Sequence, residues 1–528
     1  MSGTIHERPV NGRERLPEAS PGQSLASLLK AVPHQKVKGD SSVQVSGICV
    51  DSRSVRKGDV FVALRGVHVD GHRFIAAAVS AGASAVLCEE MPPEMDTETF
   101  PVPFIIVRDS LQSMGHLAAT LYGNPSENLV FIGVTGSNGK TTTTYLIERI
   151  LLDAGYPTGA VTTIEDRWPG HREPARFTTP QSHEYQRMLA EMVREGATHV
   201  VSEVSSHALS LHRMVGIRVR VAVFTNLSFE HREFHPDEEH YYQAKKRLFT
   251  EHLASGAGAV INMDDEAGRR LASELNTSHL RVIRYGRGND AEVRAREIEL
   301  SAKGATFDIV SPAGRKTIQS PLLGDFNVSN VLAATAVALE LEIPLESIAR
   351  SIEGFEGVPG RLETIDEGQD FTVAVDYAHS PDALENVLRT IRGLAPARVI
   401  TLMGCGGDRS PEKRAPMGRI AAELSDLVVV TADNSRSEKT RDIIEDIQEG
   451  MKGHESKILV EEDRAAAILQ AIRCARTADF VLLSGKGHEA TQTEGGVTRP
   501  FDDRIQSREA LRKVLGKAVS QGFEPCVP

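Results

Sequence analysis

The sequence predicts an α/β protein with three domains and mostly parallel sheets, on three observations. Its 528 residues exceed what one hydrophobic core usually serves. Short β-rich apolar runs alternate with stretches of helical periodicity, which is typical of parallel sheets covered by helices. Polar or Gly-rich stretches near residues 127 and 356 divide this pattern into three blocks. We therefore expect domains at residues 1–127, with a tail over about residues 1–20, at 128–356 and at 357–528.

The composition excludes several classes of function. The formal net charge is -12, which argues against a general binder of nucleic acid or of anionic membranes. Five scattered cysteines without a CxxC pair favour a reducing compartment over a disulfide framework or a zinc site. The chain shows neither a bilayer-length apolar run nor the apolar core of a secretory signal. We expect a cytoplasmic monomer without membrane insertion.

The first block contains four strand-like runs and closes with a polar stretch. The runs are Ile48–Val50, Val60–Leu64, Ala85–Leu87 and Phe104–Val107. The closing stretch, Tyr122–Ser126, combines Gly, Asn and Pro and is interpreted as a linker to the second block.

The second block opens with a strand, a glycine-rich loop and a helical pattern, which together predict an ATP site. The loop and helix start are Gly136, Ser137, Asn138, Gly139, Lys140, Thr141 and Thr142. Backbone N–H groups of such a loop surround phosphate oxygens, and the helix N-terminus adds positive potential. Lys140 can reach the β- and γ-phosphates, and the Thr141 hydroxyl can ligate Mg²⁺. Val134 stands where the motif usually has its first Gly, so this is a variant P-loop; the alternative is a coincidental Gly-rich turn.

A P-loop site also needs a carboxylate at the end of a neighbouring strand to hold Mg²⁺. The apolar run Thr198–Val201 is followed by Ser202 and Glu203, which puts Glu203 at such a place. A glutamate after a strand is usually a surface residue, but the upstream P-loop favours a metal ligand.

The third block contains one sequence pattern four times: an apolar strand followed by a polar or Gly-rich cluster. Ligands bind outside the carboxyl ends of strands in open parallel sheets, so the four clusters predict one binding face in a Rossmann-like domain. The strands are Phe371–Val375, Val399–Met403, Leu427–Val430 and Phe480–Leu483, and the clusters are Asp376–Tyr377, Gly404–Arg409, Asp433–Asn434 and Ser484–Glu489.

Six motifs, taken in order, resemble the Mur ligases of peptidoglycan synthesis over about residues 45–510. The resemblance implies an ADP-forming carbon–nitrogen ligase that works through an acyl phosphate. It implies an N-terminal domain for a UDP-linked substrate, a central P-loop ATPase-type sheet and a C-terminal amino-acid-binding Rossmann-like domain. The motifs are Thr135–Thr141, Glu203–His207, Asn226–Ser228 with His231, Gly324–Asn330, Gly360–Glu363 and Asp376–Asp382.

Four further motifs are most similar to the family members that add the third residue of the stem peptide. They are Asp51–Arg53, Thr178–Pro180, Asp433–Arg436 and Gly485–Glu489. The implied substrates are UDP-N-acetylmuramoyl-L-Ala-D-Glu, meso-diaminopimelate and ATP, with Mg²⁺ as cofactor. Ser435 departs from the usual Asp-Asn-Pro-Arg, so L-lysine stays open as the amine donor. Two other ligases, the D-Ala-D-Ala-adding enzyme and folylpolyglutamate synthase, and a P-loop ATPase switch that makes no covalent product are the remaining alternatives.

The resemblance also implies roles for individual residues. Ser52 and the loop His68–His72 would hold the uridine diphosphate end of the substrate, and His231 would act at the metal or the acyl phosphate. The other implied contacts are Thr178, Thr179, Ser205 and Arg213 for the muramoyl-peptide end, Asn327 and Asn330 for adenine, Arg361, Asp376 and His379 for closure over the nucleotide, and Arg409, Asp433, Asn434, Arg436, Gly485 and Glu489 for the amino acid.

Lys245 lies in a predicted helix, Tyr241–Phe249, where a lysine is ordinarily solvated. In the resembling enzymes the lysine of this Ala-Lys-x-x-Leu-Phe pattern is carbamylated to N6-carboxylysine. A carbamate supplies anionic oxygens of the kind that a second Mg²⁺ prefers. Lys246, its neighbour, is expected to be an ordinary surface lysine.

Overall fold

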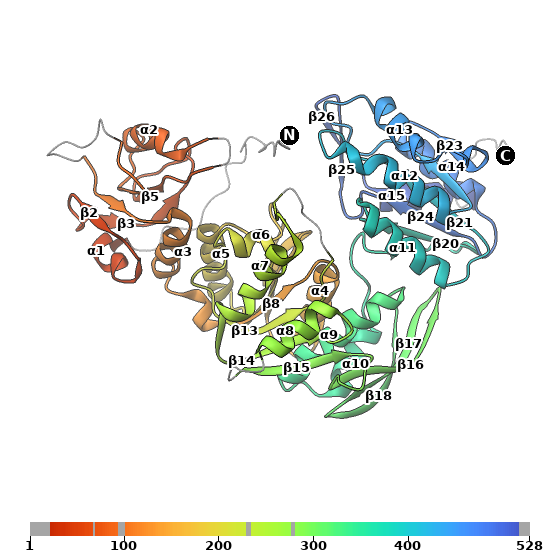
Figure 1. The fold of residues 1–528 in the computed structure, drawn as a ribbon, viewed down its shortest axis with the longest axis horizontal. Helices are drawn as coiled ribbons and strands as arrows, with labels where there is room; N and C mark the ends of the chain where they lie inside the picture. The colour runs from red at the N-terminus through yellow and green to blue at the C-terminus, as the bar shows by residue number, and fades with distance from the viewer. Residues whose placement is uncertain (1–21, 67–68, 93–100, 229–233, 276–279, 517–528) are drawn as a thin grey trace.

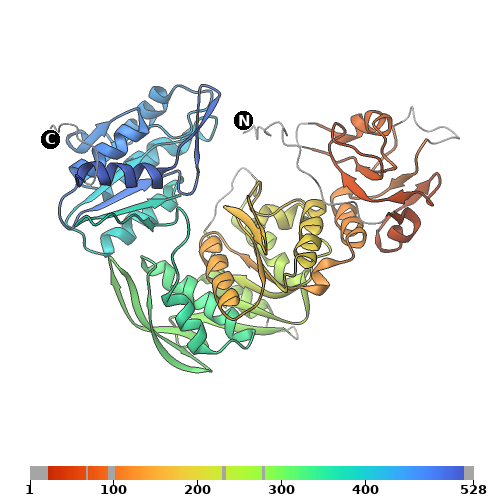
Figure 2. The same cartoon turned by 180° about the vertical axis from the view of Figure 1, so that it is seen from behind.

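The computed structural model describes residues 22–66, 69–92, 101–228, 234–275 and 280–516. The protein forms three lobes in a bent row, with the middle third of the chain between the other two (Figures 1 and 2). Each lobe is built on its own principal sheet, of five, eleven and six strands in chain order. The predicted α/β class with large parallel sheets is confirmed.

The first lobe has a five-stranded sheet in the order β2-β7-β6-β5-β4, in which only β2 runs antiparallel to its neighbour. The four predicted strands are β4 to β7. The elements are β1 Gln23–Ser24, α1 Leu25–Leu28, β2 Lys36–Lys38, β3 Gln44–Val45, β4 Gly47–Cys49, β5 Asp59–Val62, α2 Ile75–Ser80, β6 Ala85–Cys88, β7 Phe104–Ile106 and α3 Ser110–Leu121.

The middle lobe has an eleven-stranded sheet in the order β11-β10-β9-β12-β8-β13-β14-β15-β16-β17-β18. The strands from β9 to β16 in this order are parallel, and the antiparallel hairpins lie at the two edges. The strands are β8 Val130–Thr135, β9 Thr158–Val161, β10 Glu165–Trp168, β11 His171–Pro174, β12 His199–Glu203, β13 Val219–Phe224, β14 Leu253–Asn262, β15 Arg281–Gly286, β16 Val293–Ser301, β17 Gly304–Ser311 and β18 Gly314–Ser320.

Helices cover both faces of this sheet. One apolar core lies under α4, α9 and α10 and a second under α5, α7 and α8, which explains why the central strands are apolar on both faces. The bounds are α4 Lys140–Asp153, α5 Ser182–Arg194, α6 Ser206–Ser210, α7 Glu238–Thr250, α8 Glu266–Leu275, α9 Asp325–Glu340 and α10 Leu345–Glu353.

The third lobe has a six-stranded sheet in the order β19-β20-β24-β21-β22-β23, parallel except for β19. One core lies beneath α11, α12 and α13 and another beneath α14 and α15. The elements are β19 Glu363–Thr364, β20 Thr372–Asp376, α11 Pro381–Gly393, β21 Val399–Met403, α12 Arg414–Leu424, β22 Leu427–Val430, α13 Thr440–Glu449, β23 Ile458–Val460, α14 Arg464–Cys474, β24 Phe480–Ser484, β25 Thr491–Glu494, β26 Val497–Pro500 and α15 Asp503–Val514.

Both connections between the lobes are short and packed against neighbouring elements. The stretch expected to be a linker after the first lobe is a tight turn, in which Ser126 is buried and its hydroxyl donates to the Gly216 carbonyl at 3.2 Å. Between the second and third lobes, Val358 still belongs to the middle core whereas Leu362 already belongs to the third-lobe core. The chain therefore passes from one core to the next within a few residues, through Gly360.

Candidate active site

The glycine-rich loop joins β8 to α4, as predicted, and its shape requires glycine at two positions. Gly136 and Gly139 have φ of +147° and +83°, a region that L side chains rarely adopt. A Cβ on Gly139 would lie 2.4 Å from the Asn330 amide oxygen. Lys140 folds back over the loop and donates to the carbonyls of Gly136, at 2.9 Å, and Ser137, at 2.6 Å. Its ammonium is thus held beside the concave loop.

Lys245 is not the solvated helix lysine that its sequence context alone would suggest. Only 1% of the residue is exposed, and its Nζ donates to the Gly136 carbonyl at 2.8 Å. The same ammonium lies 4.3 Å from the centroid of the Tyr241 ring. Lys246 turns outward and pairs with Glu274 at 2.9 Å. Two adjacent lysines of α7 therefore have opposite environments, and the buried one reaches the phosphate loop.

Glu203 ends β12, the strand next to β8, in register with Val134. It is buried, and its carboxylate accepts hydrogen bonds from the backbone N–H and the hydroxyl of Thr163, at 2.9 and 3.2 Å. The predicted position at the carboxyl end of a neighbouring strand is confirmed. A carboxylate oriented by two donors beside a P-loop is suited to hold a cation.

The residues predicted for the muramoyl-peptide end gather around Glu203. The Thr179 hydroxyl donates to the Glu203 carbonyl at 2.8 Å and accepts from the Ser205 N–H at 3.2 Å. Arg213 donates to the Thr179 carbonyl at 2.8 Å. The Thr163 hydroxyl, whose proton goes to Glu203, lies 3.2 Å from the Thr178 hydroxyl and can accept from it. These side chains come from three separate segments, so the fold brings the predicted set together.

Asn327 and Asn330 lie in the first turns of α9, against the P-loop helix. The Asn330 amide donates to the Asn327 side-chain oxygen at 2.8 Å, and its own oxygen accepts from the Thr143 hydroxyl at 3.3 Å. Both residues are buried. The structure thus places them beside Gly139 and the start of α4.

In the third lobe the four strand-end clusters share one edge, because β20, β24, β21 and β22 are parallel neighbours. The clusters are also bonded to one another. The Asn434 amide donates to the Glu489 carboxylate at 2.7 Å, and the Gly407 N–H donates to the Asn434 carbonyl at 2.9 Å. Residues expected to bind the amino acid therefore meet at one place.

Arg436 takes an unusual backbone conformation at this edge. Its φ is +52°, and its Nη1 donates to the Gly407 carbonyl at 2.6 Å. The hairpin β25–β26 supports it, since its N–H donates to the Thr493 carbonyl at 3.0 Å. Ser435, the departure from proline, is 1% exposed, so the loop is packed despite the substitution. Arg409 and Gly485 lie on the same side; Arg409 is exposed, and Gly485 has a φ of +113°.

Arg361, Asp376 and His379 cluster at the end of β20. The Asp376 carboxylate accepts from the N–H groups of Leu362 and Ala378, at 2.8 and 2.7 Å. Burial raises the pKa of Asp376, while the nearby Arg361 charge opposes this. The Arg361 guanidinium stacks over the Tyr377 ring, 4.8 Å from its centroid. His379 is exposed beside them, its Nδ1 2.9 Å from the Tyr377 carbonyl.

In the first lobe, Ser52 is half-buried in the loop after β4. His72 accepts at Nε2 from the Glu89 N–H at 3.0 Å, so its proton is on Nδ1, 2.6 Å from Asp70. His68 and the predicted catalytic His231 lie outside the described residues. No helix in the described ranges is long and apolar enough to cross a bilayer.

Comparison with known protein families shows which family the chain belongs to. Residues 44–122 match the Mur ligase family catalytic domain, residues 134–338 the Mur ligase middle domain, and residues 360–487 the Mur ligase glutamate ligase domain. The chain belongs to the Mur ligase family. It is therefore an ATP-using ligase, as the order of motifs predicts.

Individual Mur ligases are similar over most of the chain. A Gloeobacter violaceus protein named UDP-N-acetylmuramoyl-L-alanyl-D-glutamate–2,6-diaminopimelate ligase is 45% identical, covering 89% of this chain and 94% of its own. A Bacillus licheniformis protein of the same name is 42% identical, covering 92% and 98%. A solved structure of a ligase with that name has a TM-score of 0.69 at 30% identity, covering 93% and 99%.

Two rival ligases share the Mur ligase fold with this chain, and the likeness extends to the fold alone. The D-alanyl-D-alanyl ligase of Acinetobacter baumannii has a TM-score of 0.62 at 21% identity, covering 95% of this chain and 100% of its own. The folylpolyglutamate synthase of Mycobacterium tuberculosis, solved with ADP, has a TM-score of 0.59 at 18% identity, covering 71% and 92%.

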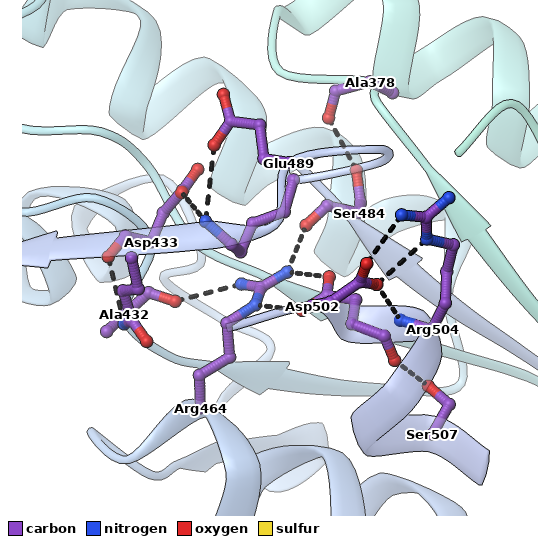
Figure 3. Close-up of polar contacts among 12 residues, drawn as sticks. Ala378, Ala432, Asp433, Arg464, Ser484, Glu489, Asp502, Arg504 and Ser507 are labelled. Carbon is purple, nitrogen blue, oxygen red and sulfur yellow. Dashed lines mark hydrogen bonds and ion pairs between the residues drawn. The ribbon is translucent and has the colours of Figure 1, made fainter. Parts of the chain in front are cut away.

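Two charged residues of this Mur ligase were missing from the predicted site. Lys486, fully buried, donates to the Thr491 carbonyl at 2.7 Å and lies 3.3 Å from Glu489 and 3.8 Å from Asp433. Arg464 is buried beneath the same carboxylates (Figure 3). Arg464 carries one sequence signal: it is the first residue of α14, where a cation opposes the helix dipole and needs a tertiary reason.

Proposed function

We propose that this Mur ligase couples meso-diaminopimelate to UDP-N-acetylmuramoyl-L-Ala-D-Glu at the expense of ATP, in peptidoglycan synthesis. The observation that carries the proposal is the amino-acid face of the third lobe, where Asn434 bonds Glu489 next to Arg436. The shared name of the relatives at 42–45% identity supports the same substrates.

The reaction must first overcome the negative charge of the substrate carboxylate, which repels an incoming amine. Transfer of the γ-phosphoryl group of ATP to a carboxylate oxygen gives an acyl phosphate with a good leaving group. The free amine then attacks the carbonyl carbon to give a tetrahedral intermediate. As this intermediate collapses, the C–O bond breaks, phosphate leaves with that oxygen and the electron pair of the bond, and the nitrogen loses a proton. Lys140 neutralises charge on the transferring group, and most of the acceleration comes from positioning.

The residues at the P-loop fit Mg²⁺. No group of three or more His, Cys, Asp or Glu side chains in the described ranges is arranged to hold a metal ion. Mg²⁺ is usually held by one or two protein oxygens together with substrate phosphates and water. The Thr141 hydroxyl and the Glu203 carboxylate supply such oxygens at one edge of the sheet. When bound, the ion would neutralise phosphate charge, and His231 belongs to the same proposed set.

A second ion would use Lys245 only as a carbamate, because a bare ammonium repels a cation. Carbamylation leaves one N–H on Nζ, so the hydrogen bond to the Gly136 carbonyl can persist while two anionic oxygens are added. Burial in α7 shields the modified side chain from water. We propose N6-carboxylysine at this position.

ATP on the middle lobe and the amine on the third lobe have to be brought together. The stretch Gly354–Gly360 connects the two lobes and is proposed as the hinge. Closure about it would carry Arg361, Asp376 and His379 over the nucleotide and exclude water from the acyl phosphate. Position 360 requires glycine, because a Cβ there would lie 2.1 Å from the backbone nitrogen of His488.

The amine donor is proposed to be meso-diaminopimelate rather than L-lysine. Diaminopimelate carries a distal carboxylate that matches the planar fork of Arg436, and its distal ammonium matches Glu489. Lysine would leave the guanidinium without that partner, and such unpaired polar groups discriminate strongly.

Product mass spectrometry tests the proposal directly. The enzyme is given UDP-N-acetylmuramoyl-L-Ala-D-Glu and ATP with equal concentrations of meso-diaminopimelate and L-lysine. The expected product carries diaminopimelate, and phosphate release requires both the carboxylate and the amine. A lysine product would overturn the donor. ATP hydrolysis without coupling would favour the ATPase alternative, and acceptance of a folate in place of the UDP substrate would favour the folylpolyglutamate alternative.

A further inference from the structure

A fully buried ion pair lies beneath the amino-acid face. Arg464 and Asp503 both have 0% exposed side chains and are joined by two hydrogen bonds, Nε to Oδ1 at 2.8 Å and Nη2 to Oδ2 at 2.6 Å. Arg464 begins α14 and Asp503 begins α15, so the pair ties together two helices that cover the same side of the sheet. Burying two charges costs desolvation free energy that their attraction does not always offset. A buried ion pair is therefore weak evidence that its role is only to stabilise the fold.

The remaining donors of Arg464 reach two strand ends. Nη1 donates to the Ala432 carbonyl at 2.9 Å and Nη2 to the Ser484 carbonyl at 3.1 Å (Figure 3). Ala432 directly precedes Asp433, and Ser484 directly precedes Gly485. One guanidinium therefore holds the backbone on the near side of both clusters that are proposed to bind the amino acid.

The bracing continues to a third strand end. The Ser484 hydroxyl donates to the Ala378 carbonyl at 2.6 Å, which joins the end of β24 to the end of β20 (Figure 3). The negative charges of the proposed site also interact with the Arg464 guanidinium. Burial alone would lower the pKa of its guanidinium, but the negative charge of Asp503, followed by those of Asp433 and Glu489, raises it above the ordinary value.

We infer that Arg464, oriented by Asp503 of the C-terminal helix, is a positioning residue for the amino-acid substrate: it fixes the spacing between the Asp433–Arg436 loop and the Gly485–Glu489 loop. The inference rests on the proposed function of that face. A planar guanidinium with donors on all three nitrogens can bond one carboxylate and two carbonyls at once, which a lysine ammonium cannot do in this geometry. Displacements of about 1 Å in a positioning contact can cost up to about a hundredfold in rate.

The same lobe offers a matched control. Arg398 pairs with Asp479, with Nε 3.1 Å from Oδ2, and its Nη2 donates to the Cys474 carbonyl at 2.8 Å. These residues directly precede β21 and β24, so this pair lies at the opposite, amino ends of the same sheet. It resembles the Arg464 pair in chemistry, although the Arg398 side chain is 32% exposed, and it lies far from the strand-end clusters.

Steady-state kinetics of Arg464→Lys and Arg398→Lys test the inference. Arg464→Lys should raise KM for meso-diaminopimelate roughly tenfold or more while KM for ATP and for the UDP substrate stays within about twofold. Arg398→Lys should leave all three KM values near those of the unaltered enzyme. An unchanged diaminopimelate KM in a folded Arg464→Lys enzyme, or an equal rise in Arg398→Lys, would overturn the inference.

Asp503→Asn provides a second variant in case Arg464→Lys does not fold. It keeps an oxygen acceptor for Arg464 but removes the charge, so a smaller rise confined to the diaminopimelate KM is expected; no rise would count against the positioning role. Failure of the proposed function and failure of the positioning role give different results. An unaltered enzyme that does not couple diaminopimelate would overturn the proposed function and this inference with it, whereas normal coupling with an indifferent Arg464→Lys enzyme would overturn the inference alone.

Discussion

The proposed phosphate site of the middle lobe and the proposed amino-acid face of the third lobe are assembled in different ways. The phosphate site is mostly one continuous segment, Gly136–Thr142, shaped by two glycines and completed by Lys245 from α7. The amino-acid face draws its residues from four strand ends that are far apart in sequence. Its geometry therefore depends on cross-bonds such as Asn434 to Glu489 and on the buried Arg464. A local site depends on backbone conformation, whereas a distributed site depends on the residues that hold its parts in register.

The largest effect is expected at the local site. Lys140→Ala should lower kcat by at least about a hundredfold, because it removes a preorganised charge from the transferring phosphoryl group. Lys246→Ala is the control, since Lys246 pairs with Glu274 away from the loop and should change kcat little. Coupled phosphate-release assays on both variants make the comparison. Turnover of Lys140→Ala near that of the unaltered enzyme would remove Lys140 from the phosphate site.

The next effect concerns the residue that completes the local site from outside it. Lys245→Arg keeps a positive charge but cannot form the same carbamate, so activity should be lost and bicarbonate should not restore it. Lys246→Arg should be almost silent, as expected for a surface change. Because a buried arginine also disturbs packing, the deciding measurement is ¹³C NMR of the unaltered enzyme in labelled bicarbonate. A carbamate signal that disappears in Lys245→Arg is expected; an active, Mg²⁺-loaded enzyme with a bare amine would contradict it.

At the distributed site, Arg436→Ala should lower kcat/KM for meso-diaminopimelate by roughly a hundredfold, because a bidentate charged pair is lost. The preference of the enzyme for meso-diaminopimelate over lysine should narrow by a similar factor. Arg441→Ala is the control, because Arg441 is an exposed arginine of α13 that pairs only with Glu445 at 3.3 Å among the described residues. Competition assays with both amines measure the change. An Arg436→Ala enzyme with undiminished discrimination would assign donor selection to other residues.

The same contrast explains what the sequence could and could not predict. The P-loop, the strand that carries Glu203 and the four strand ends were predictable, because glycine spacing and apolar runs are local signals. Only the resemblance singled out Lys245, as a carbamylated residue, and its burial was not predicted. Lys245 lies on the same face of α7 as the buried Tyr241 and Leu248, whereas Lys246 faces Glu274, and tertiary packing decides which face is covered. Lys486 and Arg464 were missed because their partners, Thr491, Asp503 and two carbonyls, are set by pairing between distant segments.

The smallest expected effect is on stability, and it should have opposite pH dependence in the two lobes. In the middle lobe, burial raises the pKa of Asp166 from 3.8 to about 7. Between these values the native carboxyl holds a proton that the unfolded chain has lost, so stability falls as pH rises from about 4 to about 7. In the third lobe, burial lowers the pKa of His488 from 6.5 to about 4, helped by the positive charge of Arg361. There the unfolded chain gains the proton first, so stability falls as pH drops from about 6.5 to about 4.

Calorimetric scans across this window separate the two contributions, because a protein of several domains unfolds in more than one transition. Asp166→Asn cannot ionise, so it should remove the decline with rising pH from the middle-lobe transition, leaving a Tm a few degrees higher above about pH 7. His488→Asn should remove the decline with falling pH from the third-lobe transition and leave the middle lobe unchanged. Each variant is the control for the other, since each should alter one transition only. A single transition that both variants shift in the same direction would show that the two lobes unfold as one unit and that their local electrostatics are not separable.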